Sequence, residues 1–515
     1  MKKVYPVAKH LQYFMHIIHK ISLAEAQRRK ERKGFFIIHN SYDEFFGYSY
    51  VPALFYLEVK TMGTLLPVSL RAGVGRTDIT PPPDCFLEGF AGRDHDAEGI
   101  HDRLNAIALA LSAHDRFTVI VSLDIVDLPD DIVDTIWRKV KTHYHLEPCR
   151  ILLNSSHTHA GPMTWPRIHP PEAPDRKKVY PDEKYLHHLV ENIVTAIVKA
   201  LSGLRPARAF CGIGETHIGI CRRAQDVSVY RGAPSGYLGI FANYPNPRKE
   251  IDRTCPVIFL TDEREQPLAL VFGASCHPTT MSHDNYLVSA EYPGVARRIL
   301  EETYHAPALF LQGIGGDVKP RRVAEETSFR SGTYEDVEAV GAELATDVKS
   351  IIERKLAPLD IRIRCALKRV PVPLAPGWDE IVWKSYTDES HPSHRRVWGE
   401  WWLRKKQTGE PIPSAVSMTL SILELSGELR FATLSGEVLT DMGFKVKRSF
   451  PSGVTLVLGY SNGRSAYIPD SAILREGGYE AIESVFFTPT MPAPWRDDIE
   501  DTILAAFREL EHELD

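Results

Sequence analysis

The chain has 515 residues, of which 43% are hydrophobic and 25% are charged, and its formal net charge is -6. This composition is typical of globular proteins with a large apolar core, and the mixed charges argue against a nucleic-acid partner. The seven cysteines are widely spread and form no CxxC pair, which favours reduced thiols in a cytoplasmic protein over a disulfide framework.

Residues 1–66 differ in pattern from the rest of the chain. A basic amphipathic pattern over residues 8–33 favours a peripheral helix or a poorly packed extension, and contact with a membrane surface is the alternative. The segment lacks the apolar stretch and cleavage site of a signal peptide, and no segment has the ~18–20 consecutive apolar residues that span a bilayer. We therefore expect a peripheral or disordered extension over 1–66 and a single catalytic domain over 67–515.

Strand and helix patterns alternate through the first part of this domain. Continuous apolar runs predict buried strands, and apolar residues at helical spacing predict helices. In chain order we expect a strand over 117–126, a helix over 130–145, a strand over 150–156, a helix over 180–203, a strand over 268–278, a helix over 292–304, a strand over 307–317 and a helix over 333–355.

The pattern changes toward strands after residue 358. We expect strands over 360–373, 415–427, 429–437 and 453–462, and a final helix over 497–514. This order predicts a layered α/β domain in which flanking helices cover a mixed β-sheet and the C-terminal half is rich in strands.

The sequence SSHTHAGP follows the strand predicted over 150–156. Side chains two residues apart lie on one face of a strand, so His157 and His159 share a face if the strand continues. Two imidazoles on one face can bind a metal ion, and a catalytic zinc site usually has three protein ligands and an open position. A histidine pair that only makes hydrogen bonds is the alternative at this point.

Polar residues follow other predicted strands or precede apolar segments. They include His101, His277, Asp317, Glu437 and Tyr467. Each position taken alone is explained by a hydrogen-bonded turn. However, polar residues at the ends of several strands are the usual way in which an α/β scaffold builds a site.

The motifs GIHDRL, SSHTHAGP, HPTTM, QGIGGDVKP, LSGEVLTDMG and GYSNGRSAYIPD resemble, in order, those of the neutral/alkaline non-lysosomal ceramidases, over about residues 70–485. The resemblance implies one Zn²⁺ per chain. Its ligands would be His101, His159, Glu437 and Tyr467. The resemblance also implies that Tyr479 helps to bind the substrate carbonyl or the oxyanion, and that His157 is a neighbour in the site rather than a ligand.

A zinc ion with these ligands keeps a net positive charge, which lowers the pKa of a bound water molecule and polarises a carbonyl group. We therefore expect a zinc-dependent amidohydrolase of sphingolipid metabolism, which resembles N-acylsphingosine amidohydrolase and uses a zinc-activated water. Thr280 stands where the family has a serine near the reacting centre, so we expect it to be catalytic together with Tyr479 and His157. His277 and Asp317 are expected to contact the substrate.

Three features of the sequence leave the substrate open. Glu291 and Tyr292 replace an acid–amide pair of the family, and we expect neither its secretion signal nor its C-terminal β-sandwich. The tryptophan-rich segment 378–409 predicts either a helix pair on the outside of the domain or an amphipathic lid over an apolar substrate. From the resemblance we expect a small-molecule or lipid amide as the substrate. The alternatives are another ester, a lactone or a small acylated metabolite, or a catalytically silent binding protein.

Overall fold

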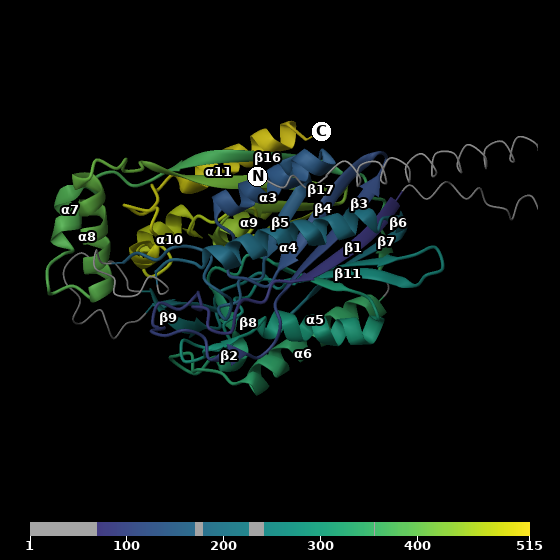
Figure 1. Cartoon of the computed structure of the whole chain (residues 1–515), viewed down its shortest axis with the longest axis horizontal. Coiled ribbons are helices and arrows are strands. Elements are labelled where there is room, and N and C mark those ends of the chain that lie inside the picture. Colours follow the sequence, from purple (N-terminus) through teal and green to yellow (C-terminus); the bar gives the residue numbers. More distant parts are fainter. Residues whose placement is uncertain (1–69, 170–178, 226–240, 355, 515) are drawn as a thin grey trace, which may run out of the picture. The chain divides into compact units, whose positions relative to one another are not determined.

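The computed structural model describes residues 70–169, 179–225, 241–354 and 356–514 (Figure 1). The chain divides into two units, Met1–Leu66 and Pro67–Asp515, and the first unit lies outside the described residues together with its amphipathic pattern. Within the described ranges, no helix combines the length and the apolarity that are needed to cross a membrane.

The first sheet has the strand order β5-β4-β3-β1-β6. Its strands are β1 (Leu70–Asp78), β3 (Asn105–Ala113), β4 (Arg116–Leu123), β5 (Ile151–Ser155) and β6 (Arg205–Pro206). β4 and β5 are parallel, and α3 (Asp130–Tyr144) connects them. α3 and α4 (Glu183–Ser202) pack on one face of the sheet (Figure 1). Gly75 of β1 permits this close packing, because a Cβ atom there would lie 2.0 Å from the carbonyl oxygen of Ala196 in α4.

The second sheet has the strand order β13-β11-β10-β7-β15. Its strands are β7 (Arg208–Glu215), β10 (Thr254–Thr261), β11 (Pro267–Ala274), β13 (Ala308–Gln312) and β15 (Ala357–Pro358). β11 and β13 are parallel, and α5 (Glu291–Tyr304) lies between them in the chain. α5 and α6 (Tyr334–Glu353) pack on one face of this sheet (Figure 1).

The third sheet has the strand order β16-β17-β18-β20. Its strands are β16 (Arg364–Pro373), β17 (Ala415–Ser426), β18 (Leu429–Leu434) and β20 (Val454–Leu458). α9 (Thr440–Ser449) connects the parallel strands β18 and β20, and α11 (Ile499–His512) packs with α9 on one face.

Short elements complete the fold. They are β2 (Gly99–Ile100), β8 (Gly219–Gln225), β9 (Phe241–Asn246), β12 (Leu287–Val288), β14 (Val318–Pro320), β19 (Glu437–Val438), β21 (Tyr467–Ile468), α10 (Ser471–Glu476), and the 3-10 turns Pro148–Arg150, Arg321–Val323 and Glu483–Phe487. β19 and β21 pair in parallel register, so that Glu437 lies opposite Tyr467.

The inner faces of the three large sheets share one apolar core. Ile120 of the first sheet, Val271 of the second and Phe431 of the third belong to the same buried cluster. The helices cover the outer faces, which is the layered, mixed α/β architecture that the sequence predicts. This fold class is confirmed, and each predicted strand and helix appears with its ends shifted by a few residues.

The tryptophan-rich segment forms α7 (Glu380–Ser385) and α8 (Ser393–Gln407). Trp383, Trp398 and Trp402 are buried in the core of the third sheet. The indole Nε1 of Trp398 donates a hydrogen bond of 3.1 Å to the carbonyl oxygen of Met491. The buried tryptophans therefore support the interpretation of α7 and α8 as a helix pair packed on the domain rather than as a mobile lid.

Candidate active site

Three buried histidines lie together where two strands of different sheets end. His157 and His159 follow β5, and His277 follows β11. One ring nitrogen of each histidine lies within 4.8 Å of those of the other two. We call these three residues the histidine cluster. Packing of the first sheet against the second brings together residues that are more than a hundred positions apart in the chain.

A turn, and not strand alternation, directs His157 into the histidine cluster. β5 ends at Ser155, and the backbone of His157 has a left-handed φ of 65°. Its amide donates a hydrogen bond of 2.9 Å to Ile125, and its Nε2 atom lies 3.1 Å from Nε2 of His159. Left-handed backbone is costly for a residue with a Cβ atom and is concentrated at functional sites.

The carboxylate of Glu437 completes the cluster. Its Oε2 atom lies 3.0 Å from Nε2 of His277 and 3.2 Å from Nε2 of His157. Burial opposes ionisation of this carboxyl group, but the charge of the His157 ring and its hydrogen bond to the carboxylate hold the pKa of Glu437 well below the usual value. Glu437 is therefore an anionic ligand candidate at neutral pH.

The hydrogen bonds of the rings define which nitrogens face inward. Nδ1 of His157 lies 2.9 Å from the carbonyl oxygen of Val126, and Nδ1 of His277 lies 2.5 Å from that of Gly315. These carbonyls fix the proton on Nδ1, so each Nε2 presents a lone pair to the cluster when the ring is neutral. Histidine ligands of metals usually donate their other N–H in this way.

Burial sets the charge states of the cluster in the metal-free protein. Burial lowers the pKa of His277 to about 4, and burial together with the neighbouring histidines lowers the pKa of His159 well below its usual value. Burial acts in the same direction on His157, but the Glu437 carboxylate outweighs it and raises the pKa of that ring. His159 and His277 are therefore neutral, and His157 shares a proton with the Glu437 carboxylate. Ring nitrogens that face one another in these charge states suit a divalent cation.

Two tyrosines lie beside Glu437. The hydroxyl oxygen of Tyr467 accepts a hydrogen bond of 3.0 Å from Nη2 of Arg222, a buried guanidinium that also binds Glu480 at 2.9 Å. The ring of Tyr479 meets that of Tyr467 edge to face, with 5.6 Å between the centroids. Burial raises the pKa of Tyr467 well above its usual value, although Arg222 opposes this shift. The phenol of Tyr467 is therefore protonated at neutral pH in the metal-free protein.

A cavity of about 320 Å³ reaches this site. His157, His159, Glu437, Tyr467 and Tyr479 line it, so a ligand in the cavity would meet two members of the histidine cluster and both phenols. This arrangement provides a cation site beside a space for a small molecule.

The family model for the N-terminal part of the neutral/alkaline non-lysosomal ceramidases matches residues 70–326. The chain belongs to this family. It is 25% identical to neutral ceramidase 1 of Arabidopsis thaliana over 316 residues, which cover 58% of this chain and 38% of that protein. It is 26% identical to neutral ceramidase B of Dictyostelium discoideum over 274 residues, which cover 49% of this chain and 36% of that protein. The matched region therefore spans well under half of these relatives.

The fold also matches a solved ceramidase. The crystal structure of neutral ceramidase from Pseudomonas aeruginosa superimposes with a TM-score of 0.63 at 17% sequence identity. The match covers 86% of this chain and 75% of that chain. At this identity the likeness concerns the fold.

His101 does not join the histidine cluster in this member of the ceramidase family. Its Nδ1 atom lies 2.8 Å from Oδ1 of Asp102, and its side chain is 36% exposed. Its ring stacks on Tyr334 with 3.6 Å between the centroids. The only group of three or more metal-ligating side chains among the described residues is the histidine cluster. The structure thus places His157 and His277 where the sequence resemblance suggested His101.

Thr280 and Asp317 also lie away from the cavity. The hydroxyl of Thr280 donates a hydrogen bond of 3.0 Å to Oε2 of Glu291 in a fully buried position. Oδ1 of Asp317 accepts hydrogen bonds from the amide and the hydroxyl of Thr440, at 2.9 and 2.7 Å. These contacts hold both side chains within the protein, so the geometry gives no support to Thr280 as a catalytic group or to Asp317 as a substrate contact. His277, also expected to bind substrate, instead contacts Glu437.

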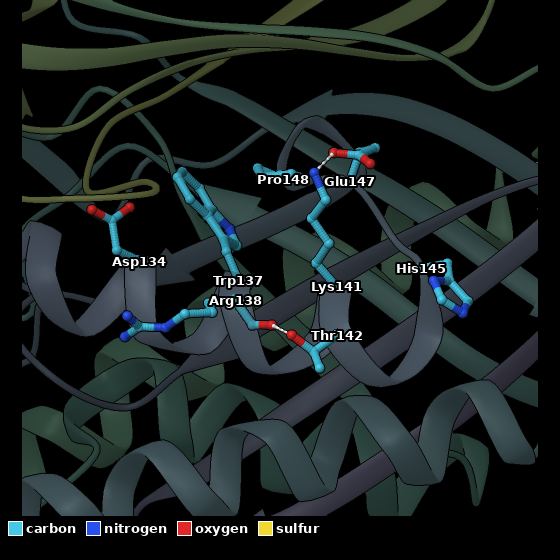
Figure 2. A pocket seen from close by; sticks show the side chains of 8 residues that line it. All are labelled: Asp134, Trp137, Arg138, Lys141, Thr142, His145, Glu147 and Pro148. Carbon is cyan, nitrogen blue, oxygen red and sulfur yellow. Dashed lines mark hydrogen bonds and ion pairs between the residues drawn. The ribbon is translucent and has the colours of Figure 1, made fainter.

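A second hollow, of about 590 Å³, lies along the outer side of α3 (Figure 2). Its lining includes Asp134, Trp137 and Lys141, and Lys141 forms an ion pair of 2.8 Å with Glu147 (Figure 2). No member of the histidine cluster lines it. The smaller cavity, and not this one, contains the groups that can carry out chemistry.

Proposed function

We propose that the chain is a zinc-dependent hydrolase that cleaves an amide bond. One observation carries the proposal: Nε2 of His157 and Nε2 of His277 approach the same oxygen of Glu437, at the wall of a cavity. Membership of the ceramidase family supports amide hydrolysis. In this reaction water adds to the carbonyl carbon, the C–N bond breaks, and the products are a carboxylic acid and an amine.

His157, His277 and Glu437 would hold the zinc ion, with His159 and Tyr467 beside them. Two imidazoles with their Nδ1 atoms bound to carbonyl groups and one ionised carboxylate are the donor types that zinc prefers. When bound, zinc would polarise a carbonyl group and lower the pKa of a water molecule.

The two tyrosines would orient the substrate carbonyl. The oxygen of Tyr467 accepts a hydrogen bond from Arg222, so its hydroxyl hydrogen can be donated to Tyr479 or to a substrate carbonyl. A protonated phenol that lines the cavity can stabilise the negative charge that develops on a carbonyl oxygen. Tyr479 lines the same cavity and can add a second donor.

Removal and return of the metal test this proposal. We expect turnover of an N-acyl substrate to disappear after treatment with a chelator and to return with zinc, in a panel of N-acyl sphingosines of short and long chain, acylated sugars and lactones. Metal-free protein should also unfold at a lower temperature, because the cation binds only the folded state. Full turnover by protein shown to be metal-free would contradict the proposal.

A further inference from the structure

Three of the charged side chains that line the cavity next to the histidine cluster are joined by ion pairs. They are Glu88, Asp127 and Arg464. Two of them are next in the chain to residues that contact the histidine cluster. Gly89, which follows Glu88, packs directly on the His159 ring, and the carbonyl oxygen of Val126, which precedes Asp127, accepts the hydrogen bond of His157. We call these three residues the charged triad.

The triad is held by defined contacts. Nη1 of Arg464 forms ion pairs with Oε1 of Glu88 and, at 3.0 Å, with Oδ1 of Asp127. The guanidinium lies over the ring of Trp165, 4.4 Å from the centroid. Oε2 of Glu88 accepts hydrogen bonds from the amide and the hydroxyl of Thr164, at 2.9 and 3.3 Å. These contacts fix the charged groups at the cavity wall.

One carboxylate oxygen of Asp127 lacks a hydrogen bond from any described residue. Its side chain is only 7% exposed, and Oδ1 lies 3.0 Å from Nη1 of Arg464 but has no hydrogen bond within the described part of the chain. A buried carboxylate oxygen without a donor is destabilising. Oδ1 itself has almost no accessible surface, whereas the side chain of its partner Arg464 is 25% exposed, so ligand hydroxyl groups in the cavity would meet this pair mainly through the guanidinium.

The donors and acceptors of the triad match a hydroxyl-rich ligand. Carboxylate oxygens accept hydrogen bonds from hydroxyl groups, and the guanidinium of Arg464 can donate to hydroxyl oxygens. A second cation, Arg167, also lines the cavity, so two arginines offset Glu88 and Asp127. The third carboxylate, Glu437, faces the histidine cluster, so this part of the wall does not require a cationic ligand. The recognition of a neutral polyol follows from this balance.

The cavity has room for the rest of a small ligand. Its volume of about 320 Å³ lies near the lower end of the ~300–1,000 Å³ that is usual for pockets that enclose drug-sized molecules. Val397 of α8, Phe486 and Phe487 line the same cavity and offer an apolar wall for a short acyl group. The ring of His394 in α8 stacks on Phe487, with 4.9 Å between the centroids, so α8 packs against this apolar wall.

We propose that the charged triad is a subsite for hydroxyl groups, and that the substrate is a compact N-acylated polyol such as an N-acetyl amino sugar, rather than a two-chain lipid. This inference rests on the proposed amide hydrolysis. Cleavage would consume water and release a short carboxylic acid and an amino polyol.

Binding and turnover test the inference separately. Binding of the amine product glucosamine is measured by calorimetry, and turnover is measured with N-acetylglucosamine, N-acetylmannosamine and N-acyl sphingosines of short and long chain. We expect wild-type protein to bind glucosamine and to cleave an N-acetyl amino sugar with a higher kcat/KM than any N-acyl sphingosine. Asp127→Asn and Glu88→Gln should raise Kd and KM at least about tenfold, as the loss of a hydrogen bond to a charged group predicts, with zinc content unchanged.

Asp134→Asn is the matched control, because Asp134 pairs with Arg369 and lines the hollow along α3 instead of the cavity. The control should behave as wild type. A higher kcat/KM for an N-acyl sphingosine, an absence of glucosamine binding, or an unchanged Kd in folded Asp127→Asn and Glu88→Gln would overturn the inference. Glucosamine binding that depends on Asp127, without turnover of any amide by zinc-loaded protein, would support the subsite and reject the proposed function.

Discussion

Nε2 of His277 lies 3.0 Å from Oε2 of Glu437, and this contact joins the end of β11 to the start of β19. The two residues are 160 positions apart in the chain and follow or begin strands of different sheets. The ends of β5, β11 and β19 must therefore pack together before the candidate metal site exists. The same carboxylate oxygen also meets His157 of the first sheet, so the three parts of the fold converge at Glu437.

Glu437→Gln should weaken zinc binding at least about a hundredfold and abolish measurable turnover, because the amide keeps the shape of the side chain but removes its charge. Zinc affinity is measured by competition with a chelator. Glu428→Gln is a suitable control, since Glu428 is exposed. Unchanged zinc affinity in Glu437→Gln would show that the carboxylate is not a ligand.

Tyr467→Phe should lower kcat about 10²- to 10³-fold while KM changes little, because a donor to a developing oxyanion acts mainly in the transition state. Steady-state kinetics on the preferred substrate measures this split. Tyr144→Phe, at an exposed position of α3, should match wild type. A large rise in KM with an unchanged kcat would assign Tyr467 to substrate binding alone.

Trp398→Ala should destabilise the protein by about 3–5 kcal/mol, the usual effect of removing a large buried aromatic side chain. Trp398 has no exposed surface and donates a hydrogen bond to Met491. Urea unfolding measures the change, and Trp401→Ala, at a half-buried position, should destabilise less. A loss below 1 kcal/mol would indicate that α7 and α8 form a loosely held lid.

Asp336→Asn should reduce stability at neutral pH by about 0.5–2 kcal/mol, because Asp336 completes the capping box at the start of α6. Hydrogen bonds from Arg330 hold its pKa below the usual range, although partial burial opposes the shift. The stabilisation is thus present above the unfolded pKa of about 3.9 and is lost as pH falls through the folded pKa. The difference in the free energy of unfolding between wild type and Asp336→Asn should be smaller at pH 2–3 than at pH 7. An equal difference at both pH values would contradict the stabilising role of the ionised Asp336.

The sequence predicts the fold better than it predicts the ligands. Buried strands and amphipathic helices carry local periodic patterns, so β5, α3 and α6 are found from the sequence alone. The site at the strand ends was also expected, and His159, Glu437 and Tyr467 do lie together there. The resemblance to the ceramidase motifs thus pointed to residues that line one cavity.

The choice among histidines depends on geometry that no local pattern contains. The left-handed turn at His157 replaces the strand alternation that was assumed, and His101 turns instead toward Asp102 and Tyr334. The presence of His277 after β11 was a usable signal, but its role depends on the distant residue Glu437. The charged triad could not be predicted, because Glu88, Asp127 and Arg464 meet only through tertiary packing.

The number of zinc ions bound per chain in three histidine variants shows whether His157 and His277 hold the metal. His157→Ala, His277→Ala and His101→Ala are purified, checked for folding by circular dichroism, and analysed for metal after dialysis against trace zinc. The account predicts about one zinc ion per chain in wild type and in His101→Ala, and a large loss in His157→Ala and His277→Ala. Full zinc occupancy in folded His157→Ala and His277→Ala, with zinc lost from His101→Ala, would contradict it.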